Sequence, residues 1–281
     1  MSIDLEHFAR RGFVRLPNAV DPELVTRWRA NAWQRMRTGE GLKEVVPPEK
    51  APRLGDLREE SAGDHGLLRV VLDGVEGVPW SEAAPAVHDA LDLLLGGVDR
   101  LCFGTLHDYL IISFPQPPPR APRRLFGFLR RKVKSSPDPR HLGSYHLDAP
   151  GQAMRLDGIR SALLGIVLWD DVAPGGGGTL LACDSPPRVA RRLAMGDGVD
   201  FVSNDEAEAI VAECEDFEEV TGSAGDVILA HAFMLHTGSP NRGGRVRMIS
   251  NPLLECSSPL AYGPEQVPRS PLEEITRSWL S

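Results

Sequence analysis

The chain alternates between short apolar runs and segments in which apolar residues recur every three or four positions, so strands and helices are expected in alternation. A first strand is expected at Phe13 to Leu16. Asp21 and Pro22 then provide a helix N-cap and a proline at the first helical position. The helix that they begin carries one apolar stripe with a spacing of four: Leu24, Trp28, Ala32 and Met36.

Further strands are expected where apolar residues are continuous. The run from Ala162 to Trp169 is bounded by polar residues and is typical of a buried strand. Residues 67–72 and 101–114 are also expected to contain strands. The stretch from Gly225 to Asn251 contains an apolar strand, a turn and a second strand, which predicts a hairpin.

Helices are expected between and after these strands, at residues 84–95, 186–195, 206–214 and 270–279. Gly96 and Gly97 give the first of them a C-terminal stop. Ser270 and Glu273 form a capping box at the start of the last. Residues 39–66 are rich in glycine, proline and charge, and are expected to form a loop.

Composition places the chain among ordinary globular proteins. It has 281 residues, 42% of them hydrophobic and 25% charged, so it can bury a sizeable core, and we expect one domain over residues 1–281. The net charge of −8 argues against general nucleic-acid binding. The four cysteines are widely spaced and predict reduced core thiols rather than a zinc site or a disulfide framework.

No apolar run reaches the roughly 18 residues that a membrane-spanning helix needs, and the first residues do not have the pattern of a signal peptide. A cytoplasmic protein without membrane insertion is therefore expected. The oligomeric state is not indicated by the sequence.

One segment, residues 115–141, departs from the overall acidity. It begins with a proline-rich stretch and then carries eight basic residues against one acid, Asp138. It can be interpreted as a solvated insertion, as a lid in which Arg123 and Arg124 recognise an anionic substrate or carrier, or as a membrane-surface helix.

Candidate chemistry is concentrated at His146 and Asp148. In extended chain, side chains two apart point to the same face, so this imidazole and carboxylate can serve one metal ion. A second imidazole completes a 2-His-1-carboxylate triad, the usual mark of a non-haem Fe(II) oxygenase. His236 and His231 are the candidates, and His236 is preferred because it precedes a Thr-Gly-Ser-Pro turn. Without such context, a solvated histidine and a strand-end aspartate would be the simpler interpretation.

Several motifs occur in a fixed order around these residues: Gly12-Phe13-Val14-Arg15-Leu16-Pro17, His146-Leu147-Asp148, Trp169-Asp170-Asp171, a glycine run before Thr179, and Leu235 to Arg242 continued to Arg247. Together they resemble the phytanoyl-CoA dioxygenase family of Fe(II)/2-oxoglutarate oxygenases. The resemblance implies a mainly β fold with flanking helices, a double-stranded β-helix of the jelly-roll, cupin-like type.

The resemblance also implies the roles of the site residues. His146, Asp148 and His236 would bind Fe(II), and Arg247 would pair with the distal carboxylate of 2-oxoglutarate, which suits the planar fork of an arginine. Dioxygen would be the second cosubstrate, and hydroxylation of an unactivated C–H bond the usual outcome. Asp148 argues against the halogenating relatives, in which a small residue vacates this position for chloride.

The chain departs from the family at two places. Gly238 occupies the position where members often have a serine, with Ser239 one place later, and Ala182 to Pro186 replaces a Pro-Gly-Ser-His motif. The hydroxyl partner of the cosubstrate is therefore open, and Ser239 and Thr179 are its candidates.

These residues do not identify the substrate. Tyr109 and Trp169 are candidates for lining its cavity, and core packing is the alternative for both. Fatty acyl-CoA, carrier-bound acyl groups, amino acids and biosynthetic intermediates all remain open, and the abundance of Arg, Ala and Gly favours bacterial specialised metabolism. Two other classes also remain open: a cupin-type enzyme that uses Zn, Mn or Fe without oxidation, and a non-catalytic binding member of the fold.

Overall fold

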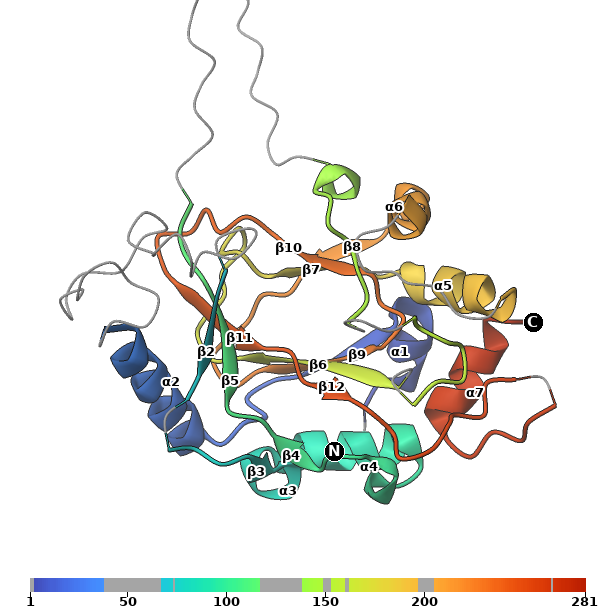
Figure 1. Ribbon diagram of the computed structural model, residues 1–281, viewed down its shortest axis with the longest axis horizontal. Coiled ribbons are helices and arrows are strands. Elements are labelled where there is room, and N and C mark those ends of the chain that lie inside the picture. The colour runs from blue at the N-terminus through green and yellow to red at the C-terminus, as the bar shows by residue number, and fades with distance from the viewer. Residues whose placement is uncertain are drawn as a thin grey trace, which may run out of the picture.

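The computed structural model describes residues 3–37, 67–72, 74–116, 138–148, 153–159, 162–196, 205–263 and 265–281. Two antiparallel sheets face each other within this part of the chain (Figure 1). The larger has the strand order β1 (Phe13–Leu16), β9 (Val227–His231), β6 (Leu163–Leu168), β11 (Arg247–Ser250), β5 (Tyr109–Ser113) and β2 (Leu67–Val71), with β12 (Leu253–Leu254) paired to β6. The smaller has the order β10 (His236–Gly238), β7 (Thr179–Ala182) and β8 (Phe217–Glu219).

Helices flank the two sheets: α1 (Leu5–Arg11), α2 (Pro22–Arg37), α3 (Trp80–Ala83), α4 (Pro85–Leu95), α5 (Ser185–Ala194), α6 (Asp205–Ala212) and α7 (Pro271–Ser278). A two-stranded pair, β3 (Val78–Pro79) with β4 (Thr105–Leu106), and two 3₁₀ turns, Val98–Arg100 and Pro139–His141, complete the described elements. The expected mainly β fold of facing antiparallel sheets with flanking helices is confirmed.

Alternation along the strands separates two apolar layers. Ile228 of β9, Ile166 of β6 and Ile249 of β11 pack with Leu181 of β7 in the layer between the sheets. The residues between them along each strand, such as Met248, pack on the outer face with the helices. Because side chains alternate strictly in a strand, the register decides which polar residues can reach the space between the sheets.

Helix α2 covers the outer face of the larger sheet, as its apolar stripe predicts. All four stripe residues are buried, and the ring of Trp28 stacks on that of Trp169 with centroids 4.8 Å apart. Helix α4 ends at Gly96, whose φ of 71° places it in the left-handed region where glycine is favoured. Both elements agree with the sequence-based expectation.

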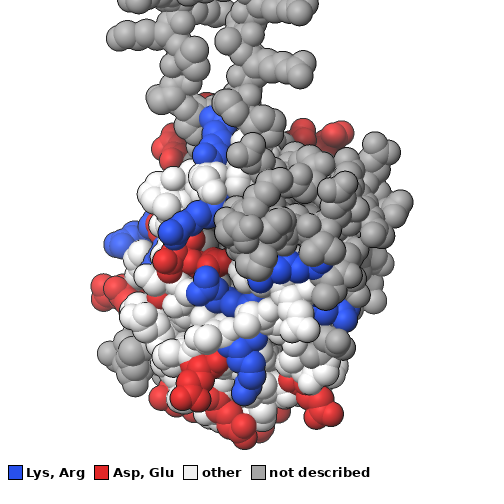
Figure 2. Space-filling view, turned by 90° about the vertical axis from the view of Figure 1, so that its left-hand side faces the viewer, with Lys and Arg blue, Asp and Glu red and all other residues white. Residues whose placement is uncertain are grey.

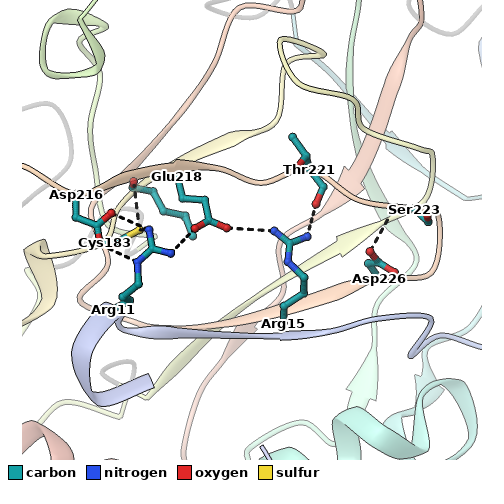
Figure 3. Close-up of polar contacts among 9 residues, drawn as sticks. Arg11, Arg15, Cys183, Asp216, Glu218, Thr221, Ser223 and Asp226 are labelled. Atoms are coloured by element: carbon teal, nitrogen blue, oxygen red, sulfur yellow. Dashed lines mark hydrogen bonds and ion pairs between the residues drawn. The ribbon is translucent and has the colours of Figure 1, made fainter. Parts of the chain in front are cut away.

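One edge of the two-sheet arrangement is closed by ion pairs (Figure 3). Arg11, the last residue of α1, donates to both carboxylate oxygens of Asp216 at 2.7 Å and to Glu218 at 2.5 Å. Arg15 of β1 reaches Glu218 at 3.3 Å and also the carbonyl of Thr221. The bond to Asp216 raises the pKa of Arg11 above its ordinary value. These contacts join the β1 edge of the larger sheet to β8.

The predicted hairpin over Gly225 to Asn251 is wrong. Strands β9 and β11 both lie in the larger sheet but are separated by β6, while His236 lies in β10 of the smaller sheet. The chain therefore crosses from one sheet to the other and back within this stretch. Apolar periodicity marks the strands, but it carries no information on which sheet each one joins.

Two further expectations need correction. Residues 144–148 do not form a regular strand: His146 makes a single isolated bridge with His236, and Ser144 has a φ of 56°. The capping box at Ser270 is only half formed, because the Ser270 hydroxyl accepts from Glu273 N while the Glu273 carboxylate accepts from Ala261 and Arg269.

The cysteines are free, as expected, but Cys102 is exposed rather than part of the core. The loop expected at 39–66 lies outside the described residues, as does most of the basic segment 115–141, including Arg123 and Arg124. Within the described ranges, none of the helices combines the length and apolar character required to cross a membrane.

His231 is a core residue with a complete set of hydrogen bonds in its neutral form. Its Nε2 lies 2.9 Å from the Thr276 hydroxyl, and its Nδ1 accepts from the backbone N–H of Phe233 at 3.0 Å. Burial lowers the pKa of His231 from 6.5 to about 3. Protonation at Nδ1 would break the bond from Phe233 and place a charge in the core.

We therefore predict that His231 makes the folded state lose stability as the pH falls from 6.5 towards 3. In this window the unfolded chain binds the proton and the folded chain does not, which costs about 1.4 kcal/mol per pH unit. His231→Gln should lower stability at neutral pH but flatten the slope. Urea unfolding at several pH values measures this, and an equal slope in both proteins would contradict the prediction.

Candidate metal centre

His146 and His236 are brought together by their backbones. Each donates its N–H to the carbonyl of the other at 3.1 Å, which makes them directly opposite residues of a one-residue antiparallel bridge. Opposite residues place their side chains on the same face. The two imidazole rings therefore lie with their centroids 4.5 Å apart.

Asp148 completes a compact group of three ligand atoms. One carboxylate oxygen lies 3.6 Å from Nε2 of His146, and the other lies 3.6 Å from Nε2 of His236. All three ligand atoms lie within 4.8 Å of one another. Two imidazoles and one carboxylate gathered in this way are the donor set of the non-haem iron facial triad, which leaves the remaining coordination positions open.

Both histidines are held in the tautomer that a metal ligand needs. Nδ1 of His146 lies 2.9 Å from the carbonyl of Ser144, and Nδ1 of His236 lies 3.0 Å from the carbonyl of Met234. A carbonyl only accepts, so each Nδ1 carries the proton and each Nε2 presents a lone pair towards Asp148. This is the usual support of a metal-bound histidine, and the residues present therefore fit a divalent metal ion.

The electrostatics of the three residues favour an ionised carboxylate. Burial of Asp148 opposes ionisation, but its interactions with His236 and His146 outweigh the effect of burial, and the pKa of Asp148 lies well below its ordinary value. Burial also opposes the protonation of His146, yet the bond to Asp148 raises its pKa overall. An anionic group faced by two imidazoles is a site prepared for a cation.

Asn251 fixes the orientation of Asp148. Its side-chain N–H donates to one carboxylate oxygen of Asp148 at 2.7 Å, from the residue that follows β11. This contact was missed by sequence reasoning, because nothing in the spacing from Asp148 to Asn251 indicates that the two residues meet. A polar side chain directly after a strand that also carries Arg247 was the only available signal.

We predict that Asn251→Ala weakens Fe(II) binding by roughly tenfold to a hundredfold, because loss of a partner that orients a metal ligand has this typical cost. Anaerobic equilibrium dialysis of Fe(II) measures the change. Ser257→Ala, a change at an exposed residue of the same C-terminal region, is the matched control. Wild-type Fe(II) affinity in a folded Asn251→Ala protein would contradict a role for Asn251 in the site.

Arg247 begins β11 and faces the space between the sheets, because it lies two residues before Ile249 of the inner layer. Only 3% of it is exposed, and its Nε and Nη1 have no hydrogen-bond partner among the described residues. Burial lowers the pKa of Arg247 to about 10, with the charge of Glu219 acting in the opposite direction. Buried donors without acceptors are rare in folded proteins, so a ligand carboxylate fits here.

On a regular strand Arg245 and Arg247 would share a face, which makes Arg245 the main alternative for this role. The structure starts β11 at Arg247, and Arg245 is exposed. The alternation therefore does not extend back to Arg245. Arg247 is buried and has side-chain N–H groups without a partner among the described residues, whereas Arg245 is exposed.

The two hydroxyl candidates differ in position. Thr179 is buried and lies opposite Gly238, two positions from the pair formed by Leu181 and His236, so it shares their inner face. The hydroxyl of Ser239 instead donates to Glu219 at 2.8 Å. The same carboxylate accepts from the backbone N–H groups of Gly175 and Gly178, so Ser239 is tied to the glycine-rich turn.

Tyr109 and Trp169, the two described candidates for lining the substrate cavity, lie on opposite sides of the larger sheet. Tyr109 is half-buried on the inner face of β5, opposite Val71. Trp169 is fully buried on the outer side, where it stacks on Trp28 and donates from Nε1 to the Ser250 hydroxyl at 2.9 Å. Core packing, the alternative considered for both residues, is what the structure shows for Trp169.

Comparisons with known proteins returned structural likenesses only: no family model and no curated protein matches this chain. Solved structures with a similar fold include the non-haem α-ketoglutarate-dependent carbocyclase SnoK from nogalamycin biosynthesis, with 16% identity over 88% of this chain and 80% of that one and a TM-score of 0.46. They also include HygX from Streptomyces hygroscopicus with nickel, 2-oxoglutarate and hygromycin B bound, with 14% identity, 88% and 84% coverage and a TM-score of 0.41.

A third structure, EvdO2 from Micromonospora carbonacea, matches over 96% of both chains at 15% identity and a TM-score of 0.45. SnoK is described as α-ketoglutarate-dependent, and the HygX structure holds 2-oxoglutarate. These likenesses concern the fold.

Proposed function

We propose that this chain is an Fe(II)- and 2-oxoglutarate-dependent oxygenase that hydroxylates an unactivated C–H bond of a small or carrier-bound anionic metabolite, with a role in bacterial specialised metabolism. His146, Asp148 and His236 hold the iron, Arg247 binds the distal carboxylate of 2-oxoglutarate, and Thr179 is the better placed hydroxyl partner. When bound, the iron and its two cosubstrates would supply an oxidant strong enough to attack such a bond.

One observation carries the proposal. The three ligand atoms converge within 4.8 Å, and a buried arginine with unpaired donors faces the same space between the sheets. A metal site alone would fit many enzymes. The addition of a permanently charged, planar donor that has no protein acceptor among the described residues is what a bound dicarboxylate requires.

Each residue has a separate task in the proposed reaction. The imidazoles and the carboxylate occupy three positions on the metal and leave the others for cosubstrates. Asn251 holds Asp148 in the orientation in which it faces both histidines. Because Asp148 supplies a carboxylate, the third protein position is filled, which favours oxygen insertion over halide transfer.

The experiment is an anaerobic titration of the purified protein, first with Fe(II) and then with 2-oxoglutarate. A chelated keto acid on Fe(II) gives a weak visible charge-transfer band, which we expect to appear and then to disappear with succinate formation when air is admitted. Intact protein that binds Fe(II) but gives no band would replace the proposal with a non-oxidative metal enzyme. Intact protein that binds no Fe(II) would indicate a non-catalytic member of the fold.

A further inference from the structure

Arg69, on the edge strand β2, lies on the same sheet face as Arg247. Ile249 is opposite Ile111 across β11 and β5, and Ile111 is opposite Arg69 across β5 and β2. Directly opposite residues share a face, and Arg247 shares that of Ile249 because the two are two positions apart. Both arginines therefore point to the side on which His236 lies.

The two arginines differ in exposure. Arg247 is buried, whereas Arg69 is exposed on the outermost strand of the sheet. Arg69 therefore presents its charge on the inner face of the larger sheet at an exposed edge, which is open to a substrate, whereas the buried Arg247 suits a cosubstrate.

Tyr109 orients Arg69 and adds a donor of its own. Nε of Arg69 donates to the Tyr109 hydroxyl at 3.2 Å. Because the phenol oxygen accepts this bond, its hydrogen is free to donate elsewhere. Among the described residues, Arg69 has no ion pair, and neither of its Nη groups is bonded to protein.

The surface around Arg69 and Tyr109 carries both apolar and charged side chains. Val71, opposite Tyr109, is 55% exposed and provides an apolar neighbour on the same face. Figure 2 shows the side of the molecule that carries β2 and α2 in Figure 1, and basic and acidic side chains are interspersed over its described part. Selection of an anion there depends on individually placed donors rather than on a broad positive field.

We propose that Arg69 and Tyr109 form a binding site for an oxyanion, a carboxylate or a phosphate, of the organic substrate that is oxidised at the metal centre. The guanidinium supplies the charge and two donor groups, the phenol supplies a third donor, and Val71 contacts the adjoining apolar part of the molecule. This site rests on the proposed function and gives it a substrate class: an amphiphilic organic anion. Arg247 and Arg69 then serve the anions of cosubstrate and substrate respectively.

The test uses the protein loaded with Fe(II) and 2-oxoglutarate under anaerobic conditions. Three probes are titrated by calorimetry: 4-phenylbutyrate, its uncharged amide, and phenyl phosphate. We expect the wild type to bind the acid or the phosphate more tightly than the amide. Arg69→Gln should weaken binding of that anion by about fivefold, the range of an exposed charge pair, and leave the amide unchanged. Tyr109→Phe should produce a smaller loss, and Arg245→Gln, at an exposed arginine beside β11, no loss.

The charge-transfer band is followed in parallel, so failure of the proposed function is recognised separately by its absence in the wild type. A stronger response to phenyl phosphate than to phenylbutyrate would assign the site to phosphate groups, and the reverse to carboxylates. Equal binding of the anions by wild type and Arg69→Gln would overturn the site. So would an Arg69→Gln protein that lost affinity for 2-oxoglutarate instead, since Arg69 would then serve the cosubstrate.

Discussion

Replacing His146, Asp148 or His236 with alanine is expected to abolish iron-dependent consumption of 2-oxoglutarate. Each residue supplies one of three protein ligands, and two ligands hold a divalent ion too weakly to keep it on the protein. Fe(II) affinity, measured by anaerobic dialysis, should fall together with turnover. The His146→Ala and Asp148→Ala chains should remain folded, because these side chains are 35% and 20% exposed and contribute little to the core, whereas the His236 side chain is 6% exposed.

His231 is the matched control for this experiment, since it is the other histidine near His236 in sequence. It is buried in the core and bonded to Thr276, so its replacement costs stability but does not remove a ligand. His231→Gln should therefore retain Fe(II) affinity and turnover at temperatures where it is folded. The assignment fails if His231→Gln loses Fe(II) while His236→Ala keeps it.

Removing the charge of Arg247 should weaken 2-oxoglutarate binding by roughly tenfold to a hundredfold or more, because hydrogen bonds to a charged group contribute about 1.5 to 3 kcal/mol. Arg247→Met is the variant for this test, because methionine removes the charge but keeps much of the side-chain volume. Titration of the charge-transfer band gives the affinity for 2-oxoglutarate, and Fe(II) affinity should hardly change. Arg245→Gln is the control, since Arg245 is exposed on the preceding turn.

The same variant has a second expected effect, on stability. A buried guanidinium with unpaired Nε and Nη1 is costly to the protein before any ligand binds. Arg247→Met should therefore keep or raise the melting temperature of the ligand-free protein, although it impairs binding. A large fall in melting temperature would mean that Arg247 is structural, and loss of 2-oxoglutarate binding in Arg242→Ala or Arg245→Gln would mean that the wrong arginine was chosen.

Local patterns were sufficient for much of the secondary structure. The stripe of Leu24, Trp28 and Met36, the glycine stop at Gly96 and the continuous apolar run of β6 each reflect interactions between residues near in sequence, so each was predictable from spacing alone. His146 and Asp148 were identified in the same way, because a two-residue separation constrains direction locally. The mainly β fold followed from the family resemblance that these motifs carry.

The tertiary structure determined which strands pair and which residues distant in sequence lie in contact. The hairpin prediction was wrong because apolar spacing does not show that β9 and β11 flank β6 while His236 crosses to the smaller sheet. For the same reason the contacts from Asn251 to Asp148 and from Ser239 to Glu219 could not be foreseen. Strand spacing determines the face on which a side chain lies, but the residue opposite it depends on sheet pairing between distant segments. That pairing begins β11 at buried Arg247 rather than at exposed Arg245, and it places Arg69 on the same sheet face as Arg247.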